Sequence, residues 1–169
     1  GAYGPAFEKG ELTVNSVLQD APLTIGSWSP KNYYGYFKGN VTVRQAVAQS
    51  MNLPAVRANM KVDLDFAYNF AKSCGLTSLV EEDKNIAPLS LGGLTKGVTP
   101  LEMASAYATI ANGGDYNEPK FYTKVLDRNN KEVLYKNYTP TRAMQKSTAA
   151  MLTTCLQEVV KSGTAAGYV

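Results

Sequence analysis

The sequence has 169 residues, of which 44% are hydrophobic and 18% charged, and this composition favours a folded domain over a disordered segment. The net charge is only +3 and no run of Lys or Arg forms a basic patch, so we expect no nucleic acid among the partners. The absence of histidine excludes Ser-His-Asp and Cys-His catalysis and most zinc chemistry within these residues, and we expect neither a metal nor a cofactor. No apolar stretch is long enough to predict a transmembrane helix.

Residues 1–40 predict a loop-rich region in which aromatic side chains are interleaved with turn-forming residues. Trp28, Tyr33 and Tyr36 are among these aromatics. One interpretation is a surface loop that aromatic packing holds in place, and the other is one wall of a binding groove. We retain both, with these three residues as the candidate groove residues.

Residues 41–114 predict a helical core, and its most informative feature is the tripeptide Ser50-Met51-Asn52. It closes an amphipathic stretch, Thr42 to Met51, whose apolar face consists of Val43, Ala46, Val47 and then Ser50. Pro54 follows, so we expect the helix to end near Met51 or Asn52. The Ser50 hydroxyl would then point inward beside the Asn52 amide, where it could relay a proton. Taken alone, the tripeptide is more typical of an ordinary polar helix end.

Two more helices are expected in this core. Asp63 can cap the first, Gly75 can end it, and its apolar stripe consists of Phe66, Ala67, Phe70, Ala71 and Cys74. The second starts at Thr99-Pro100-Leu101-Glu102, which combines a cap, a proline at the first helical position and a glutamate at the third. It continues to about Asn112 and is apolar nearly all round, so we expect it to be central and buried.

The C-terminal part predicts a β-hairpin over residues 120–136 and a helix over residues 147–162. The hairpin strands run from Phe121 to Asp127 and from Glu132 to Lys136. Ser147 is the expected cap of the final helix. Cys74 and Cys155 fall on apolar sides of predicted helices, which favours buried thiols and leaves a disulfide open. The predicted fold class is therefore mainly α with a small β-hairpin.

Four segments resemble, in order, the transpeptidase domain of class A, bifunctional penicillin-binding proteins. They are Trp28–Tyr33, Val41–Val56, Leu89–Ala104 and Ala106–Gly114. The resemblance implies the α+β fold shared with serine β-lactamases, of which residues 1–169 would be a partial domain containing the helical subdomain. In that fold the motifs Ser-x-x-Lys, Ser-x-Asn and Lys-Thr-Gly meet in one cleft.

Carried onto this chain, the resemblance implies that Ser50 relays a proton to and from the leaving group and that Asn52 hydrogen-bonds the substrate's amide. It implies peptidoglycan stem peptides and β-lactams as ligands. It also implies that the parent protein acts on the extracytoplasmic face of the bacterial membrane, anchored by an N-terminal transmembrane helix outside this chain.

The departures from the pattern are as informative as the match. No serine is followed by a lysine three residues later, so we expect the nucleophile upstream of residue 1. We expect the Lys-Thr-Gly strand beyond Val169, and we discount Lys161-Ser162-Gly163 because it continues a helical stripe. Residues 1–169 would then lack the N- and C-terminal parts of the domain, be inactive alone and expose an apolar face that favours self-association.

Two alternatives stay open at this point. A serine β-lactamase-like hydrolase would use the same fold, but Met51 stands where many β-lactamases carry Asp, and the Leu89–Met103 block argues against it. A non-catalytic helical interaction module is the second alternative, because the isolated chain would behave as one in any assay.

Overall fold

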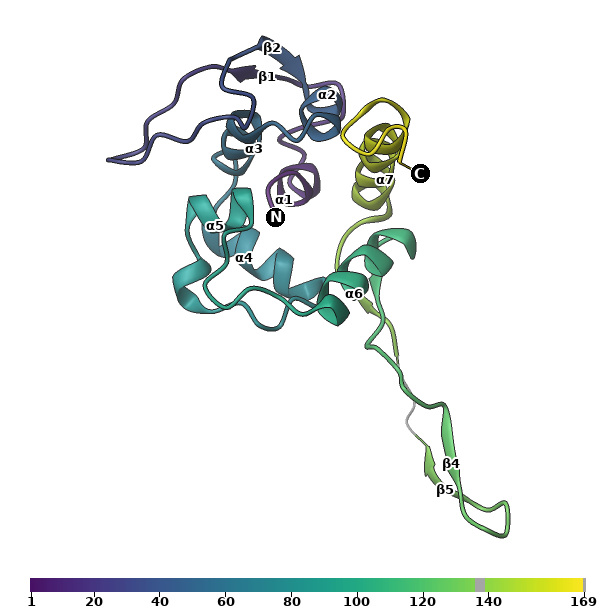
Figure 1. Ribbon diagram of the computed structural model, residues 1–169. Helices are drawn as coiled ribbons and strands as arrows, with labels where there is room; N and C mark the ends of the chain where they lie inside the picture. Colours follow the sequence, from purple (N-terminus) through teal and green to yellow (C-terminus); the bar gives the residue numbers. More distant parts are fainter. Residues whose placement is uncertain (136–138, 169) are drawn as a thin grey trace.

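The computed structural model describes residues 1–135 and 139–168 of the chain. Within them, helices surround the short helix α1 (Tyr3–Glu8), which Figure 1 shows nearly end-on with the N-terminus at the centre. The other helices are α2 (Val43–Ala48), α3 (Asn52–Asn59), α4 (Leu64–Ser73), α5 (Ile86–Leu91), α6 (Pro100–Ala111) and α7 (Lys146–Ser162), with a 3-10 turn at Glu81–Asp83. The predicted mainly α fold is confirmed for these residues.

The core around α1 explains why this helix lies at the centre. Ala6 and Phe7 of α1 pack with Val43 of α2, Ala58 of α3 and Cys155 of α7 in one buried cluster. α1 contacts α3, α4 and α7 directly.

Three two-stranded antiparallel sheets accompany the helices in the described residues, where the sequence predicted one hairpin. The pairs are β1 (Val17–Asp20) with β2 (Gly39–Thr42), β3 (Asp115–Tyr116) with β6 (Thr141–Arg142), and β4 (Lys124–Leu126) with β5 (Glu132–Tyr135). The first pair corrects the prediction for residues 1–40, because β1 and β2 join the two ends of the loop between them. Leu18 and Val41 face each other in that pair and are both buried.

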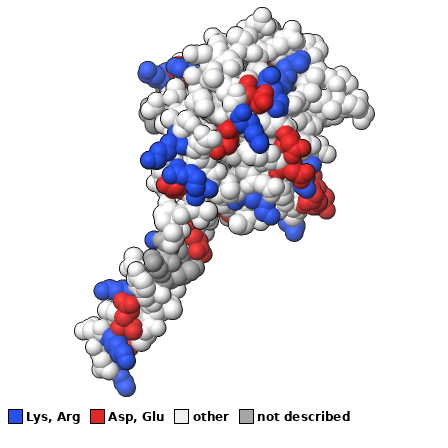
Figure 2. Space-filling view, turned by 180° about the vertical axis from the view of Figure 1, so that it is seen from behind, with Lys and Arg blue, Asp and Glu red and all other residues white. Residues whose placement is uncertain are grey.

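The predicted hairpin is confirmed as β4 and β5, and it projects well away from the body in Figure 1. Its turn is held by Asp127, whose Oδ1 accepts the backbone N–H groups of Asn129 and Lys131 at 2.8 and 2.9 Å. Lys136, the last residue of the predicted hairpin, lies outside the described residues. On the face that Figure 2 shows, acidic and basic side chains are interspersed over both the body and this projection.

Both predicted caps of the central helices are confirmed. Asp63 accepts the N–H of Phe66 at the start of α4, and Gly75 follows the helix with φ of +95°. Thr99 and Glu102 form a reciprocal capping box at the start of α6. Local side-chain chemistry was sufficient to place these ends.

The orientation of α6 is the reverse of the expectation. Its polar residues Glu102, Ser105 and Thr109 are buried, while Leu101, Met103 and Tyr107 are 46%, 42% and 54% exposed. The reason is the Glu102 carboxylate, which accepts hydrogen bonds from the hydroxyls of Thr77 and Ser78 in addition to those from Thr99. A satisfied polar stripe therefore faces inward, and the apolar side of α6 is open.

The final helix starts one residue earlier than predicted, and its cap is Gln145 instead of Ser147, which lies exposed in the first turn. The N–H of Gln145 donates to the carboxylate of Glu8 at 3.0 Å, so α1 holds this helix start. Cys74 and Cys155 are buried free thiols in separate clusters, as the sequence favoured. Across the described residues, no helix has the length and hydropathy needed to cross a membrane.

Candidate functional site

Ser50 lies in a turn and not in a helix, which corrects the sequence prediction. α2 ends at Ala48, and Ser50 has a left-handed backbone with φ of +52°. The N–H of Ser50 donates to the carbonyl of Val47, and the N–H of Met51 donates to the carbonyl of Ala46. These two bonds together form a Schellman motif. Met51, which follows the motif, is buried in one cluster with Ala46. Ser50 is consequently exposed and does not share the inward face of α2.

Pro54 does not stop a helix here. α3 begins at Asn52, directly after the turn, and Pro54 occupies its first turn, where a missing N–H is tolerated. The Ser50 turn thus joins two helices, and Asn52 is the first residue of the second. Glycine is the usual residue at the left-handed position of a Schellman motif, so a serine there is a strained choice that points to a function.

Ser50 and Asn52 line one pocket of about 250 Å³. Tyr3 of α1 and Ser90 of α5 also line this pocket. Ser90 is oriented by the buried Asn59 of α3, whose Nδ2 donates to Ser90 Oγ at 3.1 Å. The described residues that line this pocket include neither a carboxylate nor a basic side chain. Three hydroxyl-bearing side chains and one amide therefore converge on it.

Asn52 is held through both its backbone and its side chain. Its N–H donates to Asn32 Oδ1 at 3.0 Å, and its side-chain Nδ2 donates to the carbonyl of Lys31 at 2.8 Å. The second bond fixes the plane of the Asn52 amide at the rim of the pocket. Both partners lie on the loop between β1 and β2, about twenty residues earlier in the chain.

Asp20 and Asn32 lie outside the lining of the pocket but support Asn52 from behind, and the sequence analysis did not identify them. Asp20 is completely buried and Asn32 is 6% exposed. Asn32 Nδ2 donates to Asp20 at 2.7 Å, and the other Asp20 oxygen accepts the N–H of Lys38 and the hydroxyl of Tyr34. Burial, together with the charge of Asp20, raises the pKa of Tyr34 to about 12. In the sequence Asp20 and Asn32 are typical turn formers, and no local pattern indicates a buried carboxylate.

The three candidate groove residues lie on the loop between β1 and β2, outside the residues that line the Ser50 pocket. Tyr33 is fully exposed and Tyr36 is 55% exposed, whereas Trp28 is half-buried. The Tyr36 ring lies 4.5 Å from the ring of Tyr34, and its carbonyl accepts a second hydrogen bond from Asn32. Their role as a groove wall stays a prediction.

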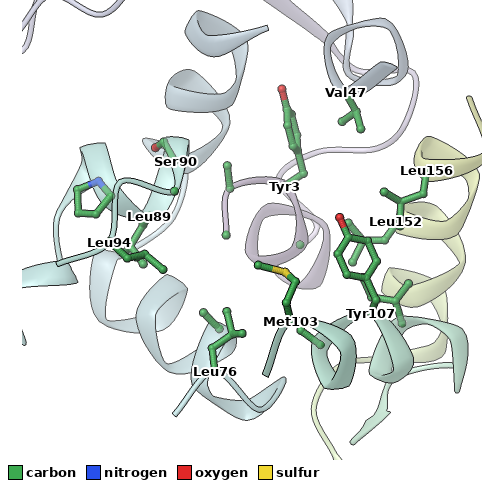
Figure 3. A pocket seen from close by; sticks show the side chains of 18 of the residues that line it. Tyr3, Val47, Leu76, Leu89, Ser90, Leu94, Met103, Tyr107, Leu152 and Leu156 are labelled. Carbon is green, nitrogen blue, oxygen red and sulfur yellow. The ribbon is translucent and has the colours of Figure 1, made fainter. Parts of the chain in front are cut away.

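A second, mostly apolar cavity of about 410 Å³ opens at the N-terminal end of α1 (Figure 3). Leu89 of α5, Met103 and Tyr107 of α6 and Leu152 of α7 line it from different sides. Tyr3 lines both cavities. Its hydroxyl is buried without a hydrogen-bond partner among the described residues, and burial raises its pKa. The exposed side of α6 is thus one wall of a cavity that α1 faces.

Comparison with known proteins decides the family. The family described as penicillin binding protein transpeptidase domain matches residues 2–169. The chain belongs to this family. This match, together with the curated relatives and solved structures below, confirms the resemblance to class A penicillin-binding proteins and the penicillin-binding transpeptidase fold.

The relatives show how much of a larger protein this family segment covers. Penicillin-binding protein 1F of Bacillus subtilis is 35% identical over 96% of this chain but only 22% of its own length. Penicillin-binding protein 4 of the same organism is 34% identical, again over 96% of this chain, and 26% of its own length is covered. The chain therefore spans about a quarter of the length of these curated relatives.

Solved structures agree on the fold. Penicillin-binding protein 1A from Haemophilus influenzae superposes with a TM-score of 0.80 at 26% identity, over 98% of this chain and 29% of that one. Penicillin-binding protein A from M. tuberculosis, solved as an imipenem acyl-enzyme complex, gives a TM-score of 0.81 at 22% identity. The match covers 95% of this chain and 42% of that one.

Proposed function

We propose that residues 1–169 are the central part of a D,D-transpeptidase that cross-links peptidoglycan stem peptides through a serine acyl-enzyme. The observation that carries the proposal is the Ser50 turn, which places a hydroxyl and the Asn52 amide on one pocket beside the N-terminus of α1. The family of the chain supports the same reaction class. In this proposal Ser50 relays the proton and Asn52 binds the substrate's amide.

The nucleophile belongs, in this proposal, to a Ser-x-x-Lys motif on turns that precede α1. No serine within residues 1–169 is followed by a lysine three residues on, so the motif must come from outside them. The apolar cavity at the N-terminus of α1 offers space for such turns, since a helix advances about 5.4 Å per turn. A lysine desolvated there would have the lowered pKa that a general base needs.

The proposed reaction has two steps. The serine oxygen attacks the carbonyl carbon of the penultimate D-Ala, the C–N bond breaks, and D-Ala leaves as an amine after receiving a proton through Ser50. The amine of a neighbouring stem then attacks the ester and returns the serine oxygen, with the proton transferred in the opposite direction. The Lys-Thr-Gly strand, which we place after residue 169, would bind the substrate carboxylate. β-Lactams would stop at the first ester.

The pocket favours a transpeptidase over the hydrolase alternative. Rapid hydrolysis of a β-lactam ester needs a group that activates water, and class A β-lactamases use a glutamate for it. The described residues around the Ser50 pocket include no carboxylate. We therefore expect a long-lived acyl-enzyme, which also separates this proposal from the non-catalytic interaction module.

The test is labelling of the full-length protein with a fluorescent penicillin. We expect stable labelling of the unmodified protein, and about a 100-fold slower acylation in Ser50→Ala because the proton relay is lost. Ser147→Ala is the matched control, since Ser147 is exposed on α7 away from the pocket. Absence of labelling in the unmodified protein would refute the enzyme assignment, and rapid release of the label would favour the hydrolase.

Two further proposals concern the context of the chain. Residues 1–169 alone should take up no penicillin, because they carry one of the three motifs. The parent protein should act on the extracytoplasmic face of the bacterial membrane, held by an N-terminal transmembrane helix outside this chain, where its stem-peptide substrates occur. Fractionation of cells that produce the full-length protein tests the second proposal.

A further inference from the structure

The start of α3 lacks a cap of its own. Met51 occupies the N-cap position, and its apolar side chain accepts no hydrogen bond from the first turn. The first helical N–H groups, those of Asn52 and Leu53, instead donate to Asn32 Oδ1 at 3.0 and 3.4 Å. A residue from a distant loop thus performs the capping that a local Ser, Thr or Asp usually provides.

The orientation of the Asn32 amide is fixed by its other contacts. Its Nδ2 donates to Asp20 at 2.7 Å and to the carbonyl of Tyr36 at 3.2 Å, so both of its N–H groups have acceptors. A flipped amide would place its oxygen against a carboxylate and a carbonyl. Asp20 in turn is held by the N–H of Lys38 and the hydroxyl of Tyr34. Asn32 therefore presents its oxygen to α3 in one orientation only.

The same loop also holds the side chain of Asn52, through the carbonyl of Lys31. Asp20, Lys31 and Asn32 together form what we term the Asn32 clamp. The clamp hydrogen-bonds Asn52 and Leu53, which follow Ser50 closely in the chain. The left-handed backbone of Ser50 is strained, so contacts of the surrounding residues must maintain it.

We propose that the Asn32 clamp positions the Ser50–Asn52 turn for acyl transfer, so that Asp20 and Asn32 are positioning residues of the reaction. The inference rests on the proposed function and deepens it. The clamp holds the two motif residues together: without it the N-terminus of α3 frays, the Asn52 amide loses its plane and the Ser50 hydroxyl leaves its place in the pocket. Misplacement of a reacting group by about 1 Å costs up to about 100-fold in rate.

The test measures penicillin acylation in variants of the full-length protein. We expect Asn32→Ala to lower the acylation rate constant by about 10- to 100-fold. Asn32→Asp should also be slow, because a second carboxylate then faces Asp20. The double exchange Asp20→Asn with Asn32→Asp restores a donor and an acceptor between the two positions but leaves a carboxylate oxygen against the Tyr36 carbonyl, so it should recover only part of the rate. Recovery would show that the rate depends on the hydrogen bond between the two side chains, and a control variant with a loss of stability elsewhere separates positioning from stability. Glu102→Gln, which we expect to destabilise the protein at a residue that lines neither cavity, controls for loss of stability.

Amide hydrogen exchange of the segment from Ser50 to Val56 provides a readout independent of acylation. We expect the Asn52 and Leu53 amides to be protected in the unmodified protein and to lose protection in Asn32→Ala. Unchanged protection overturns the clamp, and so does lost protection with acylation within about twofold of normal, which is below the loss expected from misplacement. If the unmodified protein is not acylated at all, the proposed function fails while the exchange data still judge the clamp.

Discussion

The backbone N–H of Thr164 donates a hydrogen bond to the carbonyl oxygen of Ala48 at 3.0 Å. This bond fastens the segment after α7 to the last residue of α2, two residues before Ser50. Gln49 adds a second link, since its Nε2 donates to the carbonyl of Ser162. The end of the chain that leads toward the proposed Lys-Thr-Gly strand is therefore tied to the Ser-x-Asn motif.

Gly163 makes this contact possible, and Gly163→Ala should break it. A Cβ at residue 163 would lie 2.3 Å from the Ala48 oxygen and 2.8 Å from Val159 Cα, which are backbone atoms that cannot rotate away. We expect a loss of about 1–3 kcal/mol in the free energy of unfolding, measured by urea denaturation, and slower acylation. Gly93→Ala is the matched control, because a Cβ there meets nothing within 4 Å. Equal stability of the two variants would contradict the prediction.

Ser50→Gly should separate stability from activity. The left-handed conformation of Ser50 costs a residue with a Cβ about 1–2 kcal/mol, and glycine avoids most of that cost while being more flexible when unfolded. We expect the variant to be about 0.5–1 kcal/mol more stable and, because the hydroxyl is lost, to be acylated by penicillin about 100-fold more slowly. Asn130→Gly, at a second non-glycine residue with a left-handed backbone among the described residues, should gain stability without losing acylation. A destabilised Ser50→Gly protein would show that the hydroxyl holds the turn itself.

Local sequence signals predicted part of this fold and, at the candidate site, only the pair Ser50 and Asn52. The ends of α4 and α6 followed from residues within three positions of one another, such as Thr99 and Glu102. The hairpin turn at Asp127 was similarly local. The motif residues Ser50 and Asn52 were identified as a pair, and the structure places both on one pocket.

The remaining features depend on contacts between distant residues, which periodicity does not report. The inward side of α6 was misread because the partners of Glu102 are Thr77 and Ser78, more than twenty residues away. The helix before Ser50 ends early, in a Schellman motif after which Met51 is buried in a cluster with Val41 and Ala46. Asn32 has the residue type of a turn former, and its bond to Asp20 joins two residues twelve positions apart, which no local pattern indicates.

The buried carboxylate of Glu102 should make the stability of the fold depend on pH. The N–H of Thr99 and further bonds from Ser78 and Thr77 hold the pKa of Glu102 well below its usual range. Its ionised form therefore stabilises the protein fully above the pKa of an unfolded glutamate, about 4.3, and this contribution is lost as the pH falls through the lower folded value.

We expect Glu102→Gln to lower the free energy of unfolding at pH 7 by about 2 kcal/mol and to flatten its acid dependence. Denaturation between pH 7 and pH 3 measures both effects. Asp83, whose pKa is also lowered, mainly by the N–H of Thr95, would still contribute a slope. Asp65→Asn, on the exposed partner of Lys84, should leave the curve nearly unchanged. Parallel pH curves for Glu102→Gln and the unmodified chain would refute the role of Glu102.

The isolated chain of residues 1–169 should self-associate through the open side of α6. Met103 and Tyr107 are one helical turn apart, about half exposed, and both line the apolar cavity at the N-terminus of α1. Burying such a surface against a second copy is favourable, so the double variant Met103→Lys with Tyr107→Lys should raise the concentration for dimerisation by about tenfold or more. Val133→Lys, on the exposed hairpin, tests the competing apolar surface. Light scattering over a concentration series decides between the two surfaces. If only the hairpin variant weakens association, α6 is not the contact. If the unmodified chain is a monomer at every concentration, the prediction of self-association is wrong.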